Sequence, residues 1–265
     1  MREDRKKQDK RNNFGNDLPD TSDKEFLEGR NNVFEAYRAG RTVDKLFVLE
    51  GSGDYHIQRV LKEAKKAGTL IKFVSKQRLD QLSHTGAHQG VIGIVSAMEY
   101  STIDDMLKDA GEKGEDPFII MLDGIEDPHN LGAVIRTANA VGAHGVVITR
   151  HNAASVTAIA AKASAGAVNH TKVARVNNLG NEIDSLKKKG LWFVCADMDG
   201  TLMYDNNLTG PIGLVIGNEG KGVSRLVREK CDFTVSIPMR GQIESLNASV
   251  AAGVLSYEIL RQRLK

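Results

Sequence analysis

Residues 211–255 read PIGLVIGNEGKGVSRLVREKCDFTVSIPMRGQIESLNASVAAGVL. A short apolar run, 212–216, ends at Gly217 and is followed by the polar loop 218–222. After a helix-like segment, a second apolar run ends at Ile237-Pro238. A second loop, 239–245, then leads into an Ala-rich segment that predicts a long helix from Leu246 to Leu260. Two strands that end in glycine-containing loops predict a place where the backbone approaches a ligand closely.

The composition is that of an ordinary soluble globular protein, with 41% apolar and 26% charged residues in a chain of 265. This length suggests two domains. The formal net charge is only +2, so overall charge does not indicate a nucleic-acid partner. Cys195 and Cys231 both sit in apolar runs and predict buried free thiols, which favour a reducing compartment. His84 and His88 lack a third ligand, so no metal is expected. Without a long apolar run or signal peptide, we expect a cytoplasmic protein.

Four segments are predicted along the chain. Residues 1–24 are polar and charge-rich and indicate a disordered tail. Residues 25–100 alternate short apolar runs with helical patterns and indicate a small α/β domain, with strands expected at 46–49, 70–74 and 91–95. Residues 101–117 contain six acidic residues and two lysines, which favours an acidic linker with a short helical start.

Residues 118–265 predict a mainly parallel sheet covered on both faces, because apolar runs alternate with helix-length segments. The expected strands are 118–122, 145–148, 173–176, 191–196, 212–216 and 233–237.

Two familiar signatures are excluded. The segment 217–222 is not a phosphate-binding P-loop, since Val215 stands where its first Gly should be and Gly222 follows the Lys. The segment 197–202, DMDGTL, is similar to the nucleophile motif of haloacid-dehalogenase-type phosphatases. That chemistry also needs acidic Mg²⁺ ligands on a later strand end, where acidic residues are few in this sequence: Glu219 lies in a loop of a different kind, and no Gly-Asp-x-x-x-Asp follows. We therefore predict a strand followed by an Asp/Gly turn at 197–200.

A third stretch, 122–140, reads LDGIEDPHNLGAVIRTANA. A strand is followed by an acidic turn, with Asn130 at a plausible N-cap position of the next helix. Arg136 lies within that helix. Taken alone, Asn130 is explained by capping and Arg136 by a solvated or salt-bridged helix face.

Taken together, three ordered segments resemble the SpoU (TrmH-type) RNA ribose 2′-O-methyltransferases of the SPOUT superfamily. They are DPHNLGAVIRTA at 127–138, IGNEGKGV at 216–223 and IPMRGQIESLNASVA at 237–251. The N-terminal part is similar to the small ribosomal-protein-like RNA-binding domain of the subgroup that methylates a guanosine of large-subunit rRNA. The segments that carry this second resemblance are 29–33, 39–41 and 88–91, with Asn32 in place of the common Pro.

The resemblance implies an α/β domain with a parallel sheet and a deep trefoil knot whose loops bind S-adenosyl-L-methionine. It implies a homodimer whose site is completed across the interface, with the last helix as a plausible contact. The implied pocket residues are Gly217, Ile237, Met239 and Leu246. Arg136 is implied to activate the ribose hydroxyl; since guanidinium groups stay charged at neutral pH, anchoring a phosphate and polarising the oxygen is its safer role. The implied companions of Arg136 in the catalytic site are Asn130, Glu219, Ser245 and Asn247.

The substrate stays open at this point. Methylation of large-subunit rRNA, at a guanosine, is the first expectation. The same chemistry on tRNA or on another rRNA site is the alternative, because relatives with other substrates share the three segments. A non-catalytic RNA-binding assembly factor is the third possibility, and the presence of all five implied catalytic residues argues against it.

Overall fold

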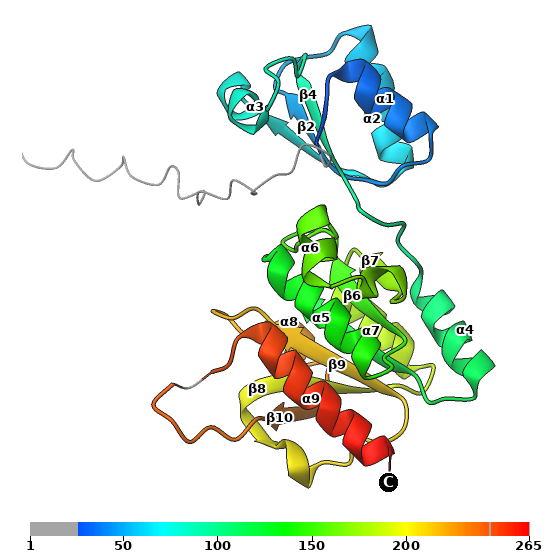
Figure 1. Cartoon of the computed structure of the whole chain (residues 1–265), viewed down its shortest axis with the longest axis vertical. Coiled ribbons are helices and arrows are strands. Elements are labelled where there is room, and N and C mark those ends of the chain that lie inside the picture. Colours follow the sequence, from blue (N-terminus) through cyan, green and yellow to red (C-terminus); the bar gives the residue numbers. More distant parts are fainter. Residues whose placement is uncertain (1–25, 244, 265) are drawn as a thin grey trace, which may run out of the picture.

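The structure, a computed structural model, describes residues 26–243 and 245–264. The charged tail predicted for residues 1–24 lies outside the described residues. Figure 1 shows two domains, with a sheet in each and a helix, α4, along the path between them. Both sheets were expected from the alternation of apolar runs and helical patterns.

The N-terminal domain contains a four-stranded sheet in the order β1 (Phe26–Glu28), β4 (Val91–Val95), β2 (Val43–Leu49) and β3 (Leu70–Val74). Helices α1 (Arg30–Arg38) and α2 (Tyr55–Lys66) cover one face, and α3 (Lys76–Leu82) packs on the other. The strands predicted at 70–74 and 91–95 are confirmed, and the strand expected at 46–49 begins three residues earlier. Neither β1 nor α3 was predicted, because each is too short for a clear apolar pattern.

The acidic segment 101–117 is more ordered than a linker. Thr102 caps α4 (Ile103–Lys113) in a reciprocal capping box with Asp105, and the helix ends at Gly114 in a left-handed conformation. Met106 is fully buried in the core of the second domain. Its sulfur lies against Gly145, where an added Cβ would come within 2.4 Å. Most of this segment therefore forms a helix packed on the second domain, because its apolar residues share one helical face.

The C-terminal domain contains a six-stranded, wholly parallel sheet, as the buried apolar runs predicted. Its order is β10 (Phe233–Ser236), β8 (Trp192–Leu202), β9 (Ile212–Gly217), β5 (Phe118–Asp123), β6 (Gly145–Thr149) and β7 (Val173–Val176). One face is covered by α5 (Pro128–Ala140), α6 (Ala158–Ala163) and α9 (Ala248–Arg263). The other is covered by α4, α7 (Leu179–Lys187) and α8 (Arg225–Arg228). The knot implied by the family resemblance stays a prediction, because strand order alone does not define how a backbone threads.

The turn predicted at 197–200 is wrong. These residues belong to β8, which continues to Leu202 and pairs with β10 through a register shift: Thr234 pairs with Cys195, and Val235 pairs with Thr201. A Cβ on Gly200 would lie 2.7 Å from the backbone of β10. The glycine therefore serves the close approach of two strands instead of a turn. Asp197 pairs with Arg228 at 2.9 Å, so its carboxylate has a structural partner.

A buried ion pair joins the two domains. Asp44 of β2 contacts Arg175 of β7, and both side chains are at most 7% exposed. The hydroxyl of Tyr100 donates to Asp44 Oδ2 at 2.9 Å and accepts from the backbone N–H of Val156 at 3.2 Å. Burial lowers the pKa of Arg175 and raises that of Tyr100. Because each polar group meets a partner from the other side, the contact holds the domains in one arrangement.

The cysteines are free, with Cys195 buried and Cys231 half-buried. Within residues 26–243 and 245–264, no helix combines the length and hydrophobicity of a membrane span.

Candidate active site

The three segments singled out in the sequence converge at the carboxyl ends of β5 and β9. These strands are neighbours, and their last residues, Asp123 and Gly217, are paired in register. The carboxyl edge of a parallel sheet is where loops from adjacent strands form ligand sites. Helices α5 and α9 pack against each other on one face of this sheet (Figure 1).

Asn130 connects the three segments. Its Nδ2 donates to Glu219 Oε1 in the loop after β9, and its Oδ1 accepts from Asn247 Nδ2 at 3.0 Å. Asn130 is 8% exposed, so both ends of its amide need partners inside the protein. The prediction that Asn130 caps α5 is wrong, since Asp127 is the N-cap and accepts from the backbone N–H of His129 at 2.8 Å. Asn130 lies within the first turn, and its side chain is used for the site.

Asn247 has two roles. It is the N-cap of α9, and its Oδ1 accepts from the backbone N–H groups of Ser249 at 2.9 Å and Val250 at 3.4 Å. Its Nδ2 donates to Asn130, as described above. Helix α9 therefore begins at Ala248, two residues later than predicted. The same amide fixes the start of the helix and the position of Asn130.

The loop after β9 is closed by its own backbone. Asn218 and Gly222 exchange N–H···O=C bonds of 3.1 and 2.8 Å. A Cβ on Gly217 would lie 2.1 Å from the backbone of Gly222 and Val223. The close approach predicted at Gly217 is therefore an approach of the chain to itself, which shapes the loop.

Two residues that sequence reasoning missed hold this loop in place. Asn218 Nδ2 donates to the carbonyl of Gly124 at 2.9 Å, and Asp123 Oδ2 accepts from the backbone N–H of Ser224 at 2.8 Å. Both are polar residues directly at the ends of neighbouring strands. That position is the signal that could have identified them.

Arg136 and Ser245 do not join the hydrogen bonds around Asn130. Ser245 is exposed, two residues before Asn247. Arg136 is exposed and, within the described residues, makes no hydrogen bond or ion pair. Arg136 lies six residues after Asn130 on α5. Six residues correspond to a rise of about 9 Å along the helix axis and to a net difference in direction of about 120° around it. Arg136 therefore projects from a different side of α5 than Asn130.

The family models match both domains. Residues 117–257 match the model described as the SpoU rRNA Methylase family, and residues 26–101 match the model for RNA 2′-O ribose methyltransferase substrate binding. The chain belongs to the SpoU rRNA methylase family. It is therefore an RNA ribose 2′-O-methyltransferase, and S-adenosylmethionine is its methyl donor.

Relatives and solved structures agree with this family. YacO of Bacillus subtilis (strain 168), assigned to the TrmH family of tRNA/rRNA methyltransferases, is 47% identical over 241 residues, covering 90% of this chain and 96% of YacO. The SpoU methyltransferase AviRb from Streptomyces viridochromogenes, in complex with AdoMet, is 28% identical with a TM-score of 0.57 and covers 90% of each chain. A crystal structure named as an RNA 2′-O ribose methyltransferase is 29% identical with a TM-score of 0.53, covering 91% of this chain and 89% of that one.

The segment between β10 and α9 fits this donor. Ile237 is half-buried against the main core, Met239 is 39% exposed and Leu246 is half-buried. Within the described residues, the backbone of residues 238–243 makes no hydrogen bond, so the carbonyl groups of this segment and the N–H groups after Pro238 are unpaired. Apolar side chains beside unpaired backbone groups suit an adenine ring.

We expect Gly217→Ala to weaken S-adenosylmethionine binding at least tenfold, because the added Cβ collides with Gly222 and Val223 and displaces the loop. Gly220→Ala is the matched control in the same loop, since its Cβ would meet nothing closer than 3.6 Å. Isothermal titration calorimetry measures both variants, with circular dichroism to confirm folding. Equal affinity in the two variants would contradict the role given to Gly217.

Proposed function

We propose that this enzyme methylates the ribose 2′-hydroxyl of a guanosine in large-subunit rRNA. The observation that carries the proposal is the convergence of Asn130, Glu219 and Asn247 through hydrogen bonds at the carboxyl edge of the sheet. The segments 29–33 and 88–91 support this substrate, since they resemble the subgroup with this specificity. The two free cysteines favour a cytoplasmic location as part of the same proposal.

In this mechanism the residues of the chain position the two reactants. S-adenosylmethionine supplies a methyl group activated by its sulfonium. Gly217, Ile237, Met239 and Leu246 would hold it along the loops after β9 and β10. Displacement at the methyl carbon requires the ribose oxygen opposite the sulfur at near-attack distance, so alignment supplies much of the rate.

Asn130, Glu219, Ser245 and Asn247 form the protein side of the catalytic site in this proposal. Glu219 is exposed at the loop and directed by its bond to Asn130, so its second carboxylate oxygen is available to a substrate hydroxyl or amino group. Arg136 would anchor the phosphate beside the target ribose and polarise the 2′-oxygen. Its charge and planar donors suit that role better than direct proton abstraction.

We expect Arg136→Ala to reduce kcat for RNA methylation at least 100-fold while S-adenosylmethionine affinity changes less than threefold. The reason is that Arg136 lies outside the loops assigned to the donor. Methyl transfer from labelled donor to an rRNA transcript gives the rate, and titration calorimetry gives the affinity. Arg225→Ala removes another exposed arginine of the same domain and serves as control. Unchanged turnover in Arg136→Ala would rule out its role.

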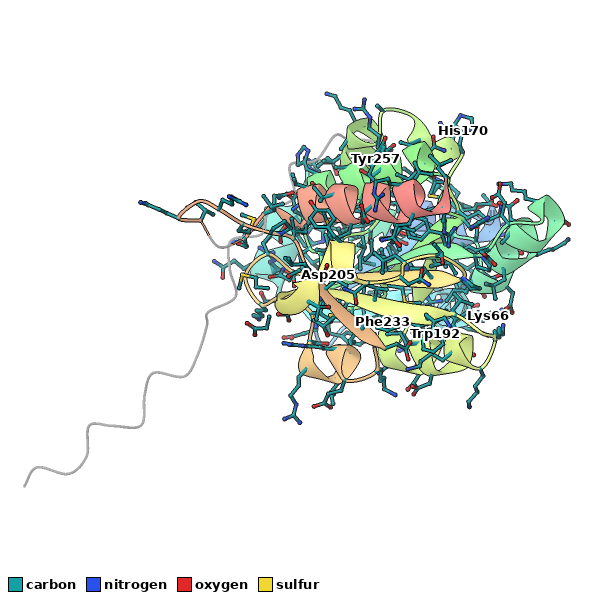
Figure 2. All side chains as sticks on the ribbon, turned by 90° about the horizontal axis from the view of Figure 1, so that it is seen from below. Lys66, His170, Trp192, Asp205, Phe233 and Tyr257 are labelled. Carbon is teal, nitrogen blue, oxygen red and sulfur yellow. The ribbon has the colours of Figure 1, made fainter. Side chains whose placement is uncertain are left out.

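We also propose a homodimer that packs through α9 and brings Arg136 to the partner subunit's site. Helix α9 exposes Val250 (49%) and Tyr257 (53%), and its C-cap Leu264 (77%) follows at the same seven-residue spacing, so the three lie on one side. Figure 2 shows Tyr257 on the outer side of α9. Arg136 faces away from the Asn130 contacts of its own chain, which is the direction that a site shared between subunits requires.

We expect Tyr257→Glu to convert a dimer into a monomer at micromolar concentration, because it places a charge in an apolar contact. Sedimentation velocity measures the oligomeric state. Leu226→Glu is the matched control, since Leu226 is 69% exposed on α8 at the opposite face of the sheet. A wild-type monomer, or a dimer that persists in Tyr257→Glu, would refute the proposed interface.

The substrate itself is tested by mapping ribose methyl groups in rRNA and tRNA from cells with and without this protein. We expect one guanosine of large-subunit rRNA to lose its 2′-O-methyl group, as seen by mass spectrometry of nuclease fragments. Loss at a tRNA position or another rRNA site would favour the alternative substrates. Loss at no position, without S-adenosylmethionine binding by calorimetry, would favour a non-catalytic assembly factor.

A further inference from the structure

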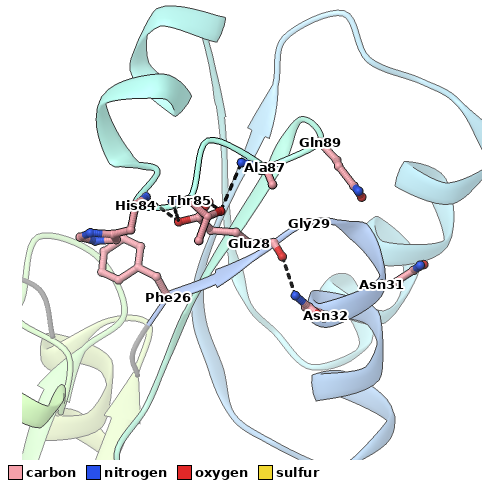
Figure 3. A pocket seen from close by; sticks show the side chains of 9 residues that line it. All are labelled: Phe26, Glu28, Gly29, Asn31, Asn32, His84, Thr85, Ala87 and Gln89. Atoms are coloured by element: carbon pink, nitrogen blue, oxygen red, sulfur yellow. Dashed lines mark hydrogen bonds between the residues drawn. The ribbon is translucent and has the colours of Figure 1, made fainter. Parts of the chain in front are cut away.

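Two of the three N-terminal segments singled out in the sequence, 29–33 and 88–91, contribute residues to one pocket. Residues 28–32 pass from β1 into α1, and residues 83–89 form the loop between α3 and β4. Together they line an open depression of about 530 Å³ on the surface of the N-terminal domain. Figure 3 shows Glu28 and Thr85 at its centre, Phe26 and His84 on one side, and Asn31 and Gln89 on the other.

The floor of the pocket is held by Glu28. Its carboxylate accepts hydrogen bonds from the hydroxyl of Ser83, the backbone N–H of His84 at 2.6 Å, and the hydroxyl of Thr85 at 2.6 Å. These bonds outweigh burial and lower the pKa of Glu28, so it stays ionised. The hydroxyls of Ser83 and Thr85 in turn accept from the backbone of Gly86 and Ala87. The loop is therefore folded around the carboxylate of Glu28, which accepts its hydrogen bonds from the loop itself.

One wall is a fixed amide. Gln89 has a positive φ of 49°, which is uncommon for a residue other than glycine. Arg30 holds it there, because Arg30 Nε donates to the Gln89 carbonyl at 2.9 Å and the Arg30 backbone N–H donates to Gln89 Oε1 at 3.3 Å. Within the described residues, Gln89 Nε2 and the side-chain amide of exposed Asn31 make no hydrogen bond. Both remain available to a ligand.

The opposite wall is aromatic. The ring of His84 packs edge-on against Phe26, with centroids 5.3 Å apart, and His84 itself is exposed. An aromatic surface facing free amide groups matches a nucleobase, which offers a flat ring and hydrogen-bonding edges. No lysine or arginine side chain lines the pocket among the described residues, so the chemistry favours a base over a phosphate.

We propose that this pocket binds one unpaired base of the RNA substrate. The inference rests on the proposed function and names the subsite that the N-terminal domain uses. A base stacked inside a duplex cannot enter a pocket of this kind, so the base must come from a loop, bulge or single strand. Asn31 and Gln89 read its edge, and the His84 ring contacts its face.

The test uses the full chain, with Asn31→Ala and Gln89→Gly as separate variants. Glycine at position 89 keeps the left-handed backbone and removes only the amide. Gln58→Ala, an exposed glutamine on α2 outside the pocket, is the control. Fluorescence anisotropy measures binding to single-stranded ten-nucleotide oligomers of A, C and U, and to an RNA duplex of the same length.

We expect each pocket variant to bind at least one single-stranded oligomer three- to tenfold more weakly than wild type, with duplex binding unchanged. In methylation of an rRNA transcript, KM for RNA should rise by a similar factor while kcat stays the same. Unchanged affinity and KM in both variants would overturn the proposal and leave the pocket to a protein or small-molecule ligand. A wild type that binds the oligomers through the pocket but methylates no rRNA would refute the rRNA substrate and leave this subsite standing.

Discussion

The site depends on one buried amide that holds three distant segments together. The residues that Asn130 contacts are 89 and 117 positions away in the sequence. A buried amide that loses a partner costs about 1–3 kcal/mol, so both contacts must form together. They can do so only when β5 and β9 are paired and α9 has packed against α5. The hydrogen bonds of the candidate site therefore form only in the completed domain, because each of them joins segments that are distant in the sequence.

Parallel topology explains why these segments meet. Strands β5 and β9 are neighbours although nearly 90 residues separate them, and their carboxyl ends point the same way. Asp123 and Asn218 then tie the loop after β9 back to β5 through backbone contacts. The loop after β10 leads to Asn247, which ends the unpaired segment and begins α9. Each loop is thus fixed at its base, whereas the backbone of residues 238–243 makes no hydrogen bond within the described residues.

The sequence predicted the architecture well because the sheet is buried on both faces. All six apolar runs of the C-terminal domain became strands, and the resemblance to the SpoU family named the fold and chemistry. Predictions from local sequence patterns were wrong where a contact with a distant part of the chain determines the local structure. The Asp/Gly turn at 197–200 became strand because the β10 backbone passes Gly200, which no composition reveals. Asn130 was assigned as a cap because Asp127-Pro128, a stronger helix start, was read as part of the turn. The prediction of a linker at 101–117 missed most of helix α4, because the many acidic residues of this segment obscure its narrow apolar face.

The buried ion pair between the domains restrains the position of the N-terminal domain relative to the candidate active site in the C-terminal domain. Removing either Asp44 or Arg175 would leave an unpaired buried charge, so the pair resists separation of the domains. Asp44 lies in β2, which pairs with β4, and β4 follows directly from the loop that forms the pocket at Glu28. The ion pair and the pocket are therefore connected through two paired strands of the same sheet. An RNA that places one base in the pocket must present its target ribose at a set distance and direction. Under the proposed function, selectivity for one nucleotide would follow from the shape of the RNA between the pocket and the candidate active site.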